Sequence, residues 1–320
     1  MSIVALYHGD SLSTLRSWKA RSVDLVFCSP PYEAARTYGI DFALKGQAWV
    51  RWAADRYMEC LRVCRGPVVW VVEGQTRKYE WSATPVLLMA EIKRRGGILR
   101  KPAVFHRVGI PGSGGPDWLR NDWEWCICAT ERRGRLPWSD NTAMGSAPKW
   151  APGGAMSNRT QDGQRINAQL SRKNYRIARG KIRAEHGKKQ TMRRNRLQGD
   201  RGGFTEQGAY SWNYLPPERC NPGNIIKCVV GGGVMGDRLA HENEAPFPEK
   251  LAEFWIRSFC PPGGTVLDPF LGSGTTAAVA AMHGRNAVGI DIRASQIELT
   301  ERRLARVGVP VDIRKPGATP

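Results

Sequence analysis

The sequence predicts an α/β protein built on a mostly parallel sheet of seven strands with helices on both faces. Short apolar, β-branched runs alternate along the chain with segments of helical periodicity, which is the pattern of a doubly covered sheet. The expected strands are 3–7, 23–28, 67–73, 103–108, 124–130, 264–268 and 286–291. The expected helices are 47–64, 81–95, 248–259, 273–284 and 294–306. A length of 320 residues leaves room for this domain and for a second module.

A glycine turn near the carboxyl end of the chain joins an expected strand directly to a helix. Its sequence is Asp268-Pro269-Phe270-Leu271-Gly272-Ser273-Gly274-Thr275-Thr276. The two glycines allow a tight turn and a close approach of the backbone to a ligand. The next apolar run ends at Asp291, where a carboxylate can accept both hydroxyls of a ribose. The pattern suits an adenosyl cofactor, although residues 272–277 also fit a nicotinamide-binding turn or a plain tight turn.

A proline turn near the start of the chain follows another expected strand. Ser29-Pro30-Pro31-Tyr32 lies at the carboxyl end of the run 23–28, where open α/β sheets bind their ligands. Two prolines fix two φ angles and remove two N–H donors, so the turn offers mainly acceptors. An exocyclic amine is a donor, and a tyrosine ring can stack on a flipped base. A Pro-Pro turn that merely ends a strand is the alternative, and the glycine turn in the same chain argues against it.

Taken together and in this order, the two motifs resemble those of the amino-directed DNA methyltransferases that use S-adenosylmethionine, in their permuted, β-type subgroup. The segments that share the resemblance are His8-Gly9-Asp10, residues 61–71, residues 121–128 and residues 245–251. The resemblance covers roughly residues 1–135 and 220–306. It implies the Rossmann-like fold of class I methyltransferases, with permuted motif order and one late strand running antiparallel.

The resemblance also implies roles for individual residues. Ser29, Pro30, Pro31 and Tyr32 form the catalytic loop. The cofactor-binding residues are Asp10, Phe247, Pro248, Asp268, Pro269, Phe270, Gly272, Ser273, Gly274, Thr275 and Asp291. A target base inside a duplex must be flipped out before its amine can reach this loop. The transfer needs no metal, because the sulfonium leaves as a neutral thioether.

The sequence also bears on which chemical group receives the methyl. A ring-carbon acceptor would need a Pro-Cys pair in the loop, which is absent, so an amine is expected. Ser29 in the first loop position resembles the cytosine-N4 subgroup, and adenine N6 is the alternative. Guanine N2, RNA and protein acceptors are further options. A nicotinamide-dependent oxidoreductase and a catalytically silent DNA-binding protein are the distant alternatives.

The charge of the chain is unevenly distributed. The net charge is +19, and residues 131–201 hold 18 Lys and Arg against 5 Asp and Glu. Aromatic and amide side chains are interleaved with this charge, which favours a phosphate-binding surface over a merely solvated insert. The candidate DNA contacts are Lys188, Lys189, Arg193 and Arg194.

The chain is therefore divided into four segments. Residues 1–135 form a catalytic half, 136–225 a basic target-recognition region, 226–308 the cofactor-binding half and 309–320 a frayed tail. Double-stranded DNA is the expected partner, and a cognate restriction nuclease remains an open one. The eight cysteines contain no C-x-x-C pair and the five histidines no metal pattern, so no metal site is expected. With neither a secretory segment nor an apolar stretch of membrane-spanning length, the expected location is cytoplasmic.

Overall fold

The computed structural model describes residues 2–33, 42–109, 119–146, 219–231, 236–243 and 245–314. The chain divides into two compact units, residues 1–144 with 222–320 and residues 145–221. The predicted DNA contacts Lys188, Lys189, Arg193 and Arg194 lie outside the described residues. The fold below is that of the first unit, and the recognition role of the region 136–225 stays a prediction.

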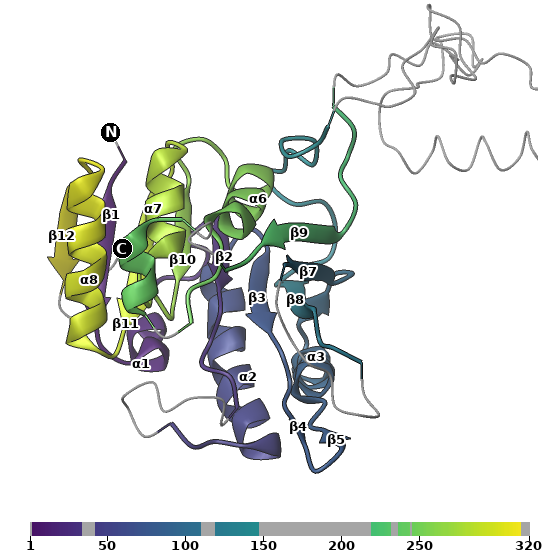
Figure 1. The fold of residues 1–320 in the computed structure, drawn as a ribbon. Helices are drawn as coiled ribbons and strands as arrows, with labels where there is room; N and C mark the ends of the chain where they lie inside the picture. Colours follow the sequence, from purple (N-terminus) through teal and green to yellow (C-terminus); the bar gives the residue numbers. More distant parts are fainter. Residues whose placement is uncertain are drawn as a thin grey trace, which may run out of the picture. The chain divides into compact units, whose positions relative to one another are not determined.

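The first unit contains a sheet whose strands follow the order β12-β1-β11-β10-β2-β3-β8-β7-β9, with β6 paired to β8 (Figure 1). The strands are β1 Val4–His8, β2 Leu25–Cys28, β3 Val68–Val72, β6 Ile98–Leu99, β7 Ala103–Val108, β8 Trp123–Thr130, β9 Ile225–Val229, β10 Thr265–Asp268, β11 Asn286–Asp291 and β12 Val311–Arg314. β8 is antiparallel to β3, β6 and β7, and the other pairings are parallel. The predicted mostly parallel sheet with one late antiparallel strand is confirmed, but among the described residues it has ten strands instead of seven, because β6, β9 and β12 were not predicted.

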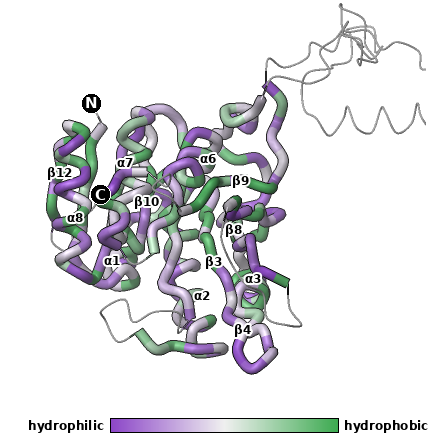
Figure 2. The backbone as a smooth tube through the Cα atoms, in the orientation of Figure 1, coloured by the Kyte–Doolittle hydropathy of each residue, from purple (hydrophilic) through white to green (hydrophobic). Residues whose placement is uncertain are grey.

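Helices cover both faces of this sheet, and the sheet separates two cores. α1 Ser11–Arg16, α2 Gly46–Val63 and α3 Thr84–Arg94 contribute to one core. α6 Glu249–Phe259, α7 Thr275–Met282 and α8 Ala294–Arg306 contribute to the other. Every residue of β3 is buried, and Figure 2 shows this strand as hydrophobic over most of its length. Such a run is what a strand covered by helices on both faces requires.

Three predicted boundaries are wrong. The tail from 309 was expected to fray, but β12 pairs in parallel with β1 through the register Val4↔Val311; residues 315–320 lie outside the described residues. The helix expected from residue 81 begins at Thr84, because β4 Thr76–Arg77 and β5 Glu80–Trp81 form a hairpin before it. Ile225, placed at the end of the insert, is the first residue of β9, which pairs with β7.

Two further features concern the described residues only. Their helices include none that combines the length and the apolar character needed to cross a bilayer. Their His, Cys, Asp and Glu side chains do not gather in groups of three that could hold a metal ion.

Candidate active site

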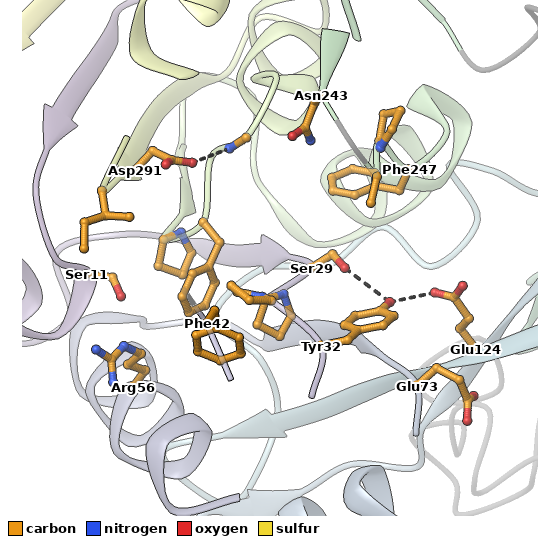
Figure 3. Close-up of a pocket in the computed structure, with 18 of the residues that line it drawn as sticks. Ser11, Ser29, Tyr32, Phe42, Arg56, Glu73, Glu124, Asn243, Phe247 and Asp291 are labelled. Atoms are coloured by element: carbon orange, nitrogen blue, oxygen red, sulfur yellow. Dashed lines mark hydrogen bonds between the residues drawn. The ribbon is translucent and has the colours of Figure 1, made fainter. Parts of the chain in front are cut away.

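A cavity of about 700 Å³ opens at the edge of the sheet where the central parallel strands end. Residues that follow β1, β2, β3, β10 and β11 line it, so the cavity lies where open α/β sheets bind their ligands. Because β8 runs in the opposite direction, its amino-terminal end brings Glu124 to the same edge. Figure 3 shows side chains from these strand ends around the cavity. The arrangement brings together the two motifs that the sequence places far apart.

The glycine turn forms one wall of the cavity. Asp291 accepts hydrogen bonds from the backbone N–H of Gly272 at 2.9 Å and of Arg293 at 2.9 Å, so its buried carboxylate holds the turn against the end of β11. Gly272 has a φ of +51°, and a Cβ there would lie 2.9 Å from Asn243 Nδ2. Any larger residue would be strained and would push the Asn243 side chain out of place.

A second layer supports the turn from behind. Arg303 is almost completely buried in α8 and donates to the Ser273 carbonyl at 3.0 Å and to Thr275 Oγ1 at 2.9 Å. The same guanidinium pairs with Glu249 at the start of α6. Thr300 Oγ1 donates to the Gly272 carbonyl at 3.2 Å. Ser273 and Thr275 therefore hold the backbone in shape and do not line the cavity.

Asp268 is a buried carboxyl group at the end of β10. Its Oδ1 accepts from Phe270 N at 3.0 Å, and its Oδ2 has no hydrogen-bond partner among the described residues. The Thr276 hydroxyl lies near it, but its hydrogen bond goes to the Phe27 carbonyl at 3.3 Å. Burial raises the pKa of Asp268 to about 7, and the nearby Thr276 hydroxyl and the hydrogen bond from Phe270 N offset only part of this rise.

Aromatic side chains and an ion pair close one end of the cavity. Trp52 packs against Phe42 at 4.8 Å and against Phe270 at 5.7 Å between ring centroids. The Arg56 guanidinium lies 4.4 Å from the centroid of the Trp52 ring and 2.6 Å from Asp10 Oδ2. Asp10 also caps α1 by accepting from Ser13 N at 3.0 Å. Burial alone would raise the pKa of Asp10, but the bonds from Ser13 N and Arg56 outweigh it and the pKa is lowered.

The proline turn forms the opposite wall. Ser29 Oγ donates to Tyr32 Oη at 3.2 Å, and Tyr32 Oη donates to Glu124 Oε2 at 2.7 Å (Figure 3). The Pro31 carbonyl accepts from Trp49 Nε1 at 2.9 Å, which ties the turn to α2. The turn is therefore fixed on both sides, and the Tyr32 ring is held by its hydroxyl.

Charged side chains that sequence reasoning missed complete this wall. Arg107 Nη1 lies 3.2 Å from Glu124 Oε1. Glu73 Oε1 accepts from Gly74 N at 2.8 Å and from Trp81 Nε1 at 3.2 Å. Burial raises the pKa of both Glu73 and Glu124, and the negative charge of Glu124 raises that of Glu73 further. A charged residue inside an expected buried strand, as in the run 124–130, was the available signal.

The structure places most of the predicted site residues on the cavity. Those that line it are Ser29, Pro30, Pro31, Tyr32, Asp10, Phe247, Pro248, Pro269, Phe270, Gly272 and Asp291. Those behind its wall are Asp268, Ser273, Gly274 and Thr275. The individual roles assigned to these residues remain predictions.

Curated relatives match the chain over different lengths. The orphan methyltransferase M.BamHII of Bacillus amyloliquefaciens is 44% identical over 68 residues, which are 21% of this chain and 26% of that protein. The DNA adenine methyltransferase YhdJ of Escherichia coli is 23% identical over 304 residues, which are 93% of this chain and 82% of that protein. The first match thus spans about a quarter of its relative, whereas the second spans most of both chains.

Solved structures share the fold. The PvuII DNA methyltransferase, which is cytosine-N4-specific, has a TM-score of 0.59 at 17% identity, covering 98% of this chain and 95% of that one. A protein described as a DNA modification methylase of Thermus thermophilus, solved with S-adenosyl-L-methionine, has a TM-score of 0.55 at 20% identity, covering 98% of this chain and all of that one. These likenesses confirm the class I methyltransferase fold.

The sequence profile of the N6/N4 DNA methylase family matches residues 23–302, a stretch that includes the proline turn, the insert and the glycine turn. This match covers most of the chain. The order of the motifs, the fold and the shared cavity agree with it, and the resemblance inferred from the sequence is confirmed. The chain belongs to the N6/N4 DNA methylase family.

Proposed function

We propose that this protein transfers a methyl group from S-adenosylmethionine to the N4 amine of a cytosine that has been flipped out of double-stranded DNA. The observation that carries the proposal is the common cavity: the glycine turn and Ser29-Pro30-Pro31-Tyr32 line opposite walls of one space. A volume of about 700 Å³ is within the range of small-molecule sites and leaves room for more than one planar ring. The general activity is methylation of an exocyclic amine in DNA, and cytosine N4 is the particular amine that we propose.

The residues present fit S-adenosylmethionine. The Asp291 carboxylate at the end of β11 would hold the ribose hydroxyls, and the absent Cβ of Gly272 leaves its backbone open to the ligand. Trp52 and Phe270 would supply apolar surface for the adenine, and Phe247 and Pro248 line the same cavity. When bound, the cofactor supplies an electrophilic methyl group on a sulfonium sulfur.

The residues of the proline turn would prepare the amine. Ser29 Oγ donates a hydrogen bond to Tyr32 Oη or to the Val71 carbonyl at 3.3 Å, so it keeps a lone pair that can accept from an amino hydrogen of the base. A hydrogen bond from the amine draws its nitrogen toward tetrahedral geometry and frees its lone pair for attack. Tyr32 would stack on the base and hold it at attack distance, so catalysis rests on positioning and electrostatics.

Serine in the first loop position supports cytosine N4, through the resemblance to that subgroup. The alternative is adenine N6, which is supported by the long match to a DNA adenine methyltransferase. Mass spectrometry of nucleosides from duplex DNA, treated with enzyme and labelled cofactor, separates the two. N4-methylcytosine is the expected product; N6-methyladenine would replace the proposal with its alternative, and an unmodified duplex would overturn both.

The basic region supports DNA as the partner. If its Lys and Arg side chains contact DNA phosphates, the logarithm of DNA affinity should fall linearly with the logarithm of salt concentration, with a slope of about −0.9 per contacted phosphate. Neutralising Lys188, Lys189, Arg193 and Arg194 together should reduce this slope and leave cofactor affinity intact. An unchanged slope would show that this cluster is only a solvated surface.

A further inference from the structure

A directed chain of hydrogen bonds leads from the cavity into the sheet. It runs from Ser29 Oγ through Tyr32 Oη to Glu124 Oε2, with steps of 3.2 Å and 2.7 Å (Figure 3). An ionised carboxylate can only accept, so Glu124 sets the direction: Tyr32 donates to it, and Ser29 can donate to Tyr32. The oxygen of Ser29 is then the open end of the chain, and it faces the cavity.

The far end of the hydrogen-bond chain is shielded from solvent and lies beside a cation. The Glu124 side chain is only 13% exposed. Its Oε2 accepts the hydrogen bond from Tyr32, and its other oxygen, Oε1, pairs with Arg107. The titratable and charged groups around Glu124 are Arg107 on β7, Glu73 directly after β3, Tyr32, and Cys126 on the same strand as Glu124. A carboxylate kept in such a place is costly unless it is paired, and here both of its oxygens are.

We propose that Glu124 takes up, through Tyr32 and Ser29, the proton that the target amine loses on methylation. This inference rests on the proposed function, since it requires an amine in the cavity. It identifies Glu124 as a residue that acts through the proline turn and does not itself touch the base.

The step balances as follows in atoms and electrons. A bond forms between the amine nitrogen and the methyl carbon, and the bond between that carbon and sulfur breaks, with its electron pair left on sulfur. The nitrogen is then cationic. One of its protons passes to Ser29 Oγ, the Ser29 proton passes to Tyr32 Oη, and the Tyr32 proton passes to Glu124. The exocyclic nitrogen of cytosine shares its lone pair with an electron-poor ring, so its protonated form is a far stronger acid than a carboxylic acid and the transfer runs downhill.

The same chain also helps before the proton moves. An ionised Glu124 polarises the hydroxyls of Tyr32 and Ser29, so that Ser29 accepts more strongly from the amine as positive charge develops on it. The rate should therefore follow the ionised fraction of Glu124. Burial raises the pKa of Glu124, although Arg107 and the Tyr32 hydroxyl oppose the rise. The rate should fall as pH drops through this raised pKa.

Single-turnover methylation across a range of pH tests the proposal with three variants and one control. Glu124→Gln keeps an acceptor for Tyr32 but cannot take a proton, and Tyr32→Phe keeps the ring but breaks the chain. Each should lower the rate about 100-fold, the lower end of the effect of a general base, and remove the acid limb that Glu124 causes. The double variant should be no slower than the slower single one, because the two residues act as a unit. Glu298→Gln, on the exposed face of α8, should behave as wild type.

Two readouts do not depend on turnover. Calorimetry should give the wild-type affinity for S-adenosylmethionine in all variants, which also shows that they fold. Difference infrared spectroscopy of the protein without cofactor should show titrating protonated-carboxyl bands in wild type and Glu298→Gln; Glu124→Gln should lose one of these bands and keep those of Asp268 and Glu73.

The outcomes are separable. If Glu124→Gln keeps the acid limb, or if the effects of Glu124→Gln and Tyr32→Phe simply multiply in the double variant, the proton path is wrong although the enzyme still methylates DNA. If wild type transfers no methyl group to DNA, the proposed function fails and this inference fails with it.

Discussion

The two walls of the cavity are built in different ways. The wall formed by the glycine turn, named the cofactor wall after its proposed role, is held by nearby residues and one helix: Asp291 binds Gly272 N, and Arg303 binds Ser273 and Thr275. The wall formed by the proline turn, named the base wall after its proposed role, is held by side chains that meet across strands, with Tyr32 bonded to Glu124 from 92 positions away in sequence. One wall thus shapes the backbone, and the other arranges protons and charges.

This difference matches the tasks proposed for the two walls. A cofactor that is bound in every cycle needs a fixed cradle, which backbone geometry and buried hydrogen bonds supply. A base whose amine must gain a methyl group and lose a proton needs groups that can change charge. Glu73 and Glu124, which can change charge, lie on the base wall together with Arg107, which pairs with Glu124. Substitutions on the two walls should therefore separate binding from chemistry.

The largest expected effect is on the base wall. Tyr32→Ala removes the proposed stacking surface, about 1–3 kcal/mol per base, and the middle link of the hydrogen-bond chain. We expect methyl transfer to fall roughly 10³- to 10⁴-fold in single-turnover kinetics. The affinity for S-adenosylmethionine, measured by calorimetry, should stay at the wild-type level. Near-normal turnover would remove Tyr32 from both roles.

The next effect concerns a carboxyl group behind the cofactor wall. The pKa of Asp268 is raised from 3.8 to about 7 by burial, so folding must keep it protonated or bury its charge. A raised carboxyl pKa lowers stability as pH rises from about 4 to about 7, and the full penalty persists above that range. At 1.36 kcal/mol per unit the penalty is on the order of 4 kcal/mol.

Asp268→Asn should therefore match wild type near pH 4 and become increasingly more stable as pH approaches 8. Chemical denaturation at several pH values measures this difference. A pH-independent difference between the two proteins would show that Asp268 is not protonated in the folded state below pH 7.

The sequence predicts the cofactor wall better than the base wall, and the reason is physical. The glycine turn and Asp291 can be found from local patterns, since a strand, two glycines and an acidic strand end already define the shape. Ser29 and Tyr32 were found in the same way. Glu73, Glu124 and Arg107 come together only through the register of β3, β8 and β7, and no local pattern contains that register.

The fold shows the same division. The central strands are recognisable as continuous apolar runs because both of their faces are buried, as in β3. β9 and β12 lie at the two edges of the sheet, and exposed residues occur along both of them. Such segments pair because a neighbouring strand offers hydrogen bonds, which composition alone does not reveal.

A smaller effect is expected from the layer behind the glycine turn. Arg303→Met leaves the Ser273 carbonyl and Glu249 without their cation, and breaking a buried, hydrogen-bonded ion pair costs about 3 kcal/mol. We expect this loss in the free energy of unfolding, together with weaker cofactor binding. Arg306 lies on the same helix and forms an exposed ion pair with Asp237. Arg306→Met removes this pair and should change stability by less than about 0.5 kcal/mol. Equal losses in both variants would deny Arg303 a special role.

The smallest effect tests the carboxylate of the cofactor wall directly. Asp291→Ala should weaken binding of S-adenosylmethionine by roughly 1.5–3 kcal/mol, the scale of hydrogen bonds to a charged group. Asp291→Asn keeps an acceptor for Gly272 N and should lose less than the alanine variant, because the turn keeps its shape while the charge is gone. Asp312→Ala, at an exposed position of β12, should leave the affinity unchanged.

Calorimetry with all three proteins decides between two functions of Asp291. If only the alanine variant binds weakly and the asparagine variant binds like wild type, the carboxylate serves to hold the turn, and the ribose is bound elsewhere. If the alanine variant also binds like wild type, Asp291 has no part in the site. A graded loss, with asparagine between wild type and alanine, is expected because the residue both shapes the turn and carries the charge that the ribose hydroxyls would meet.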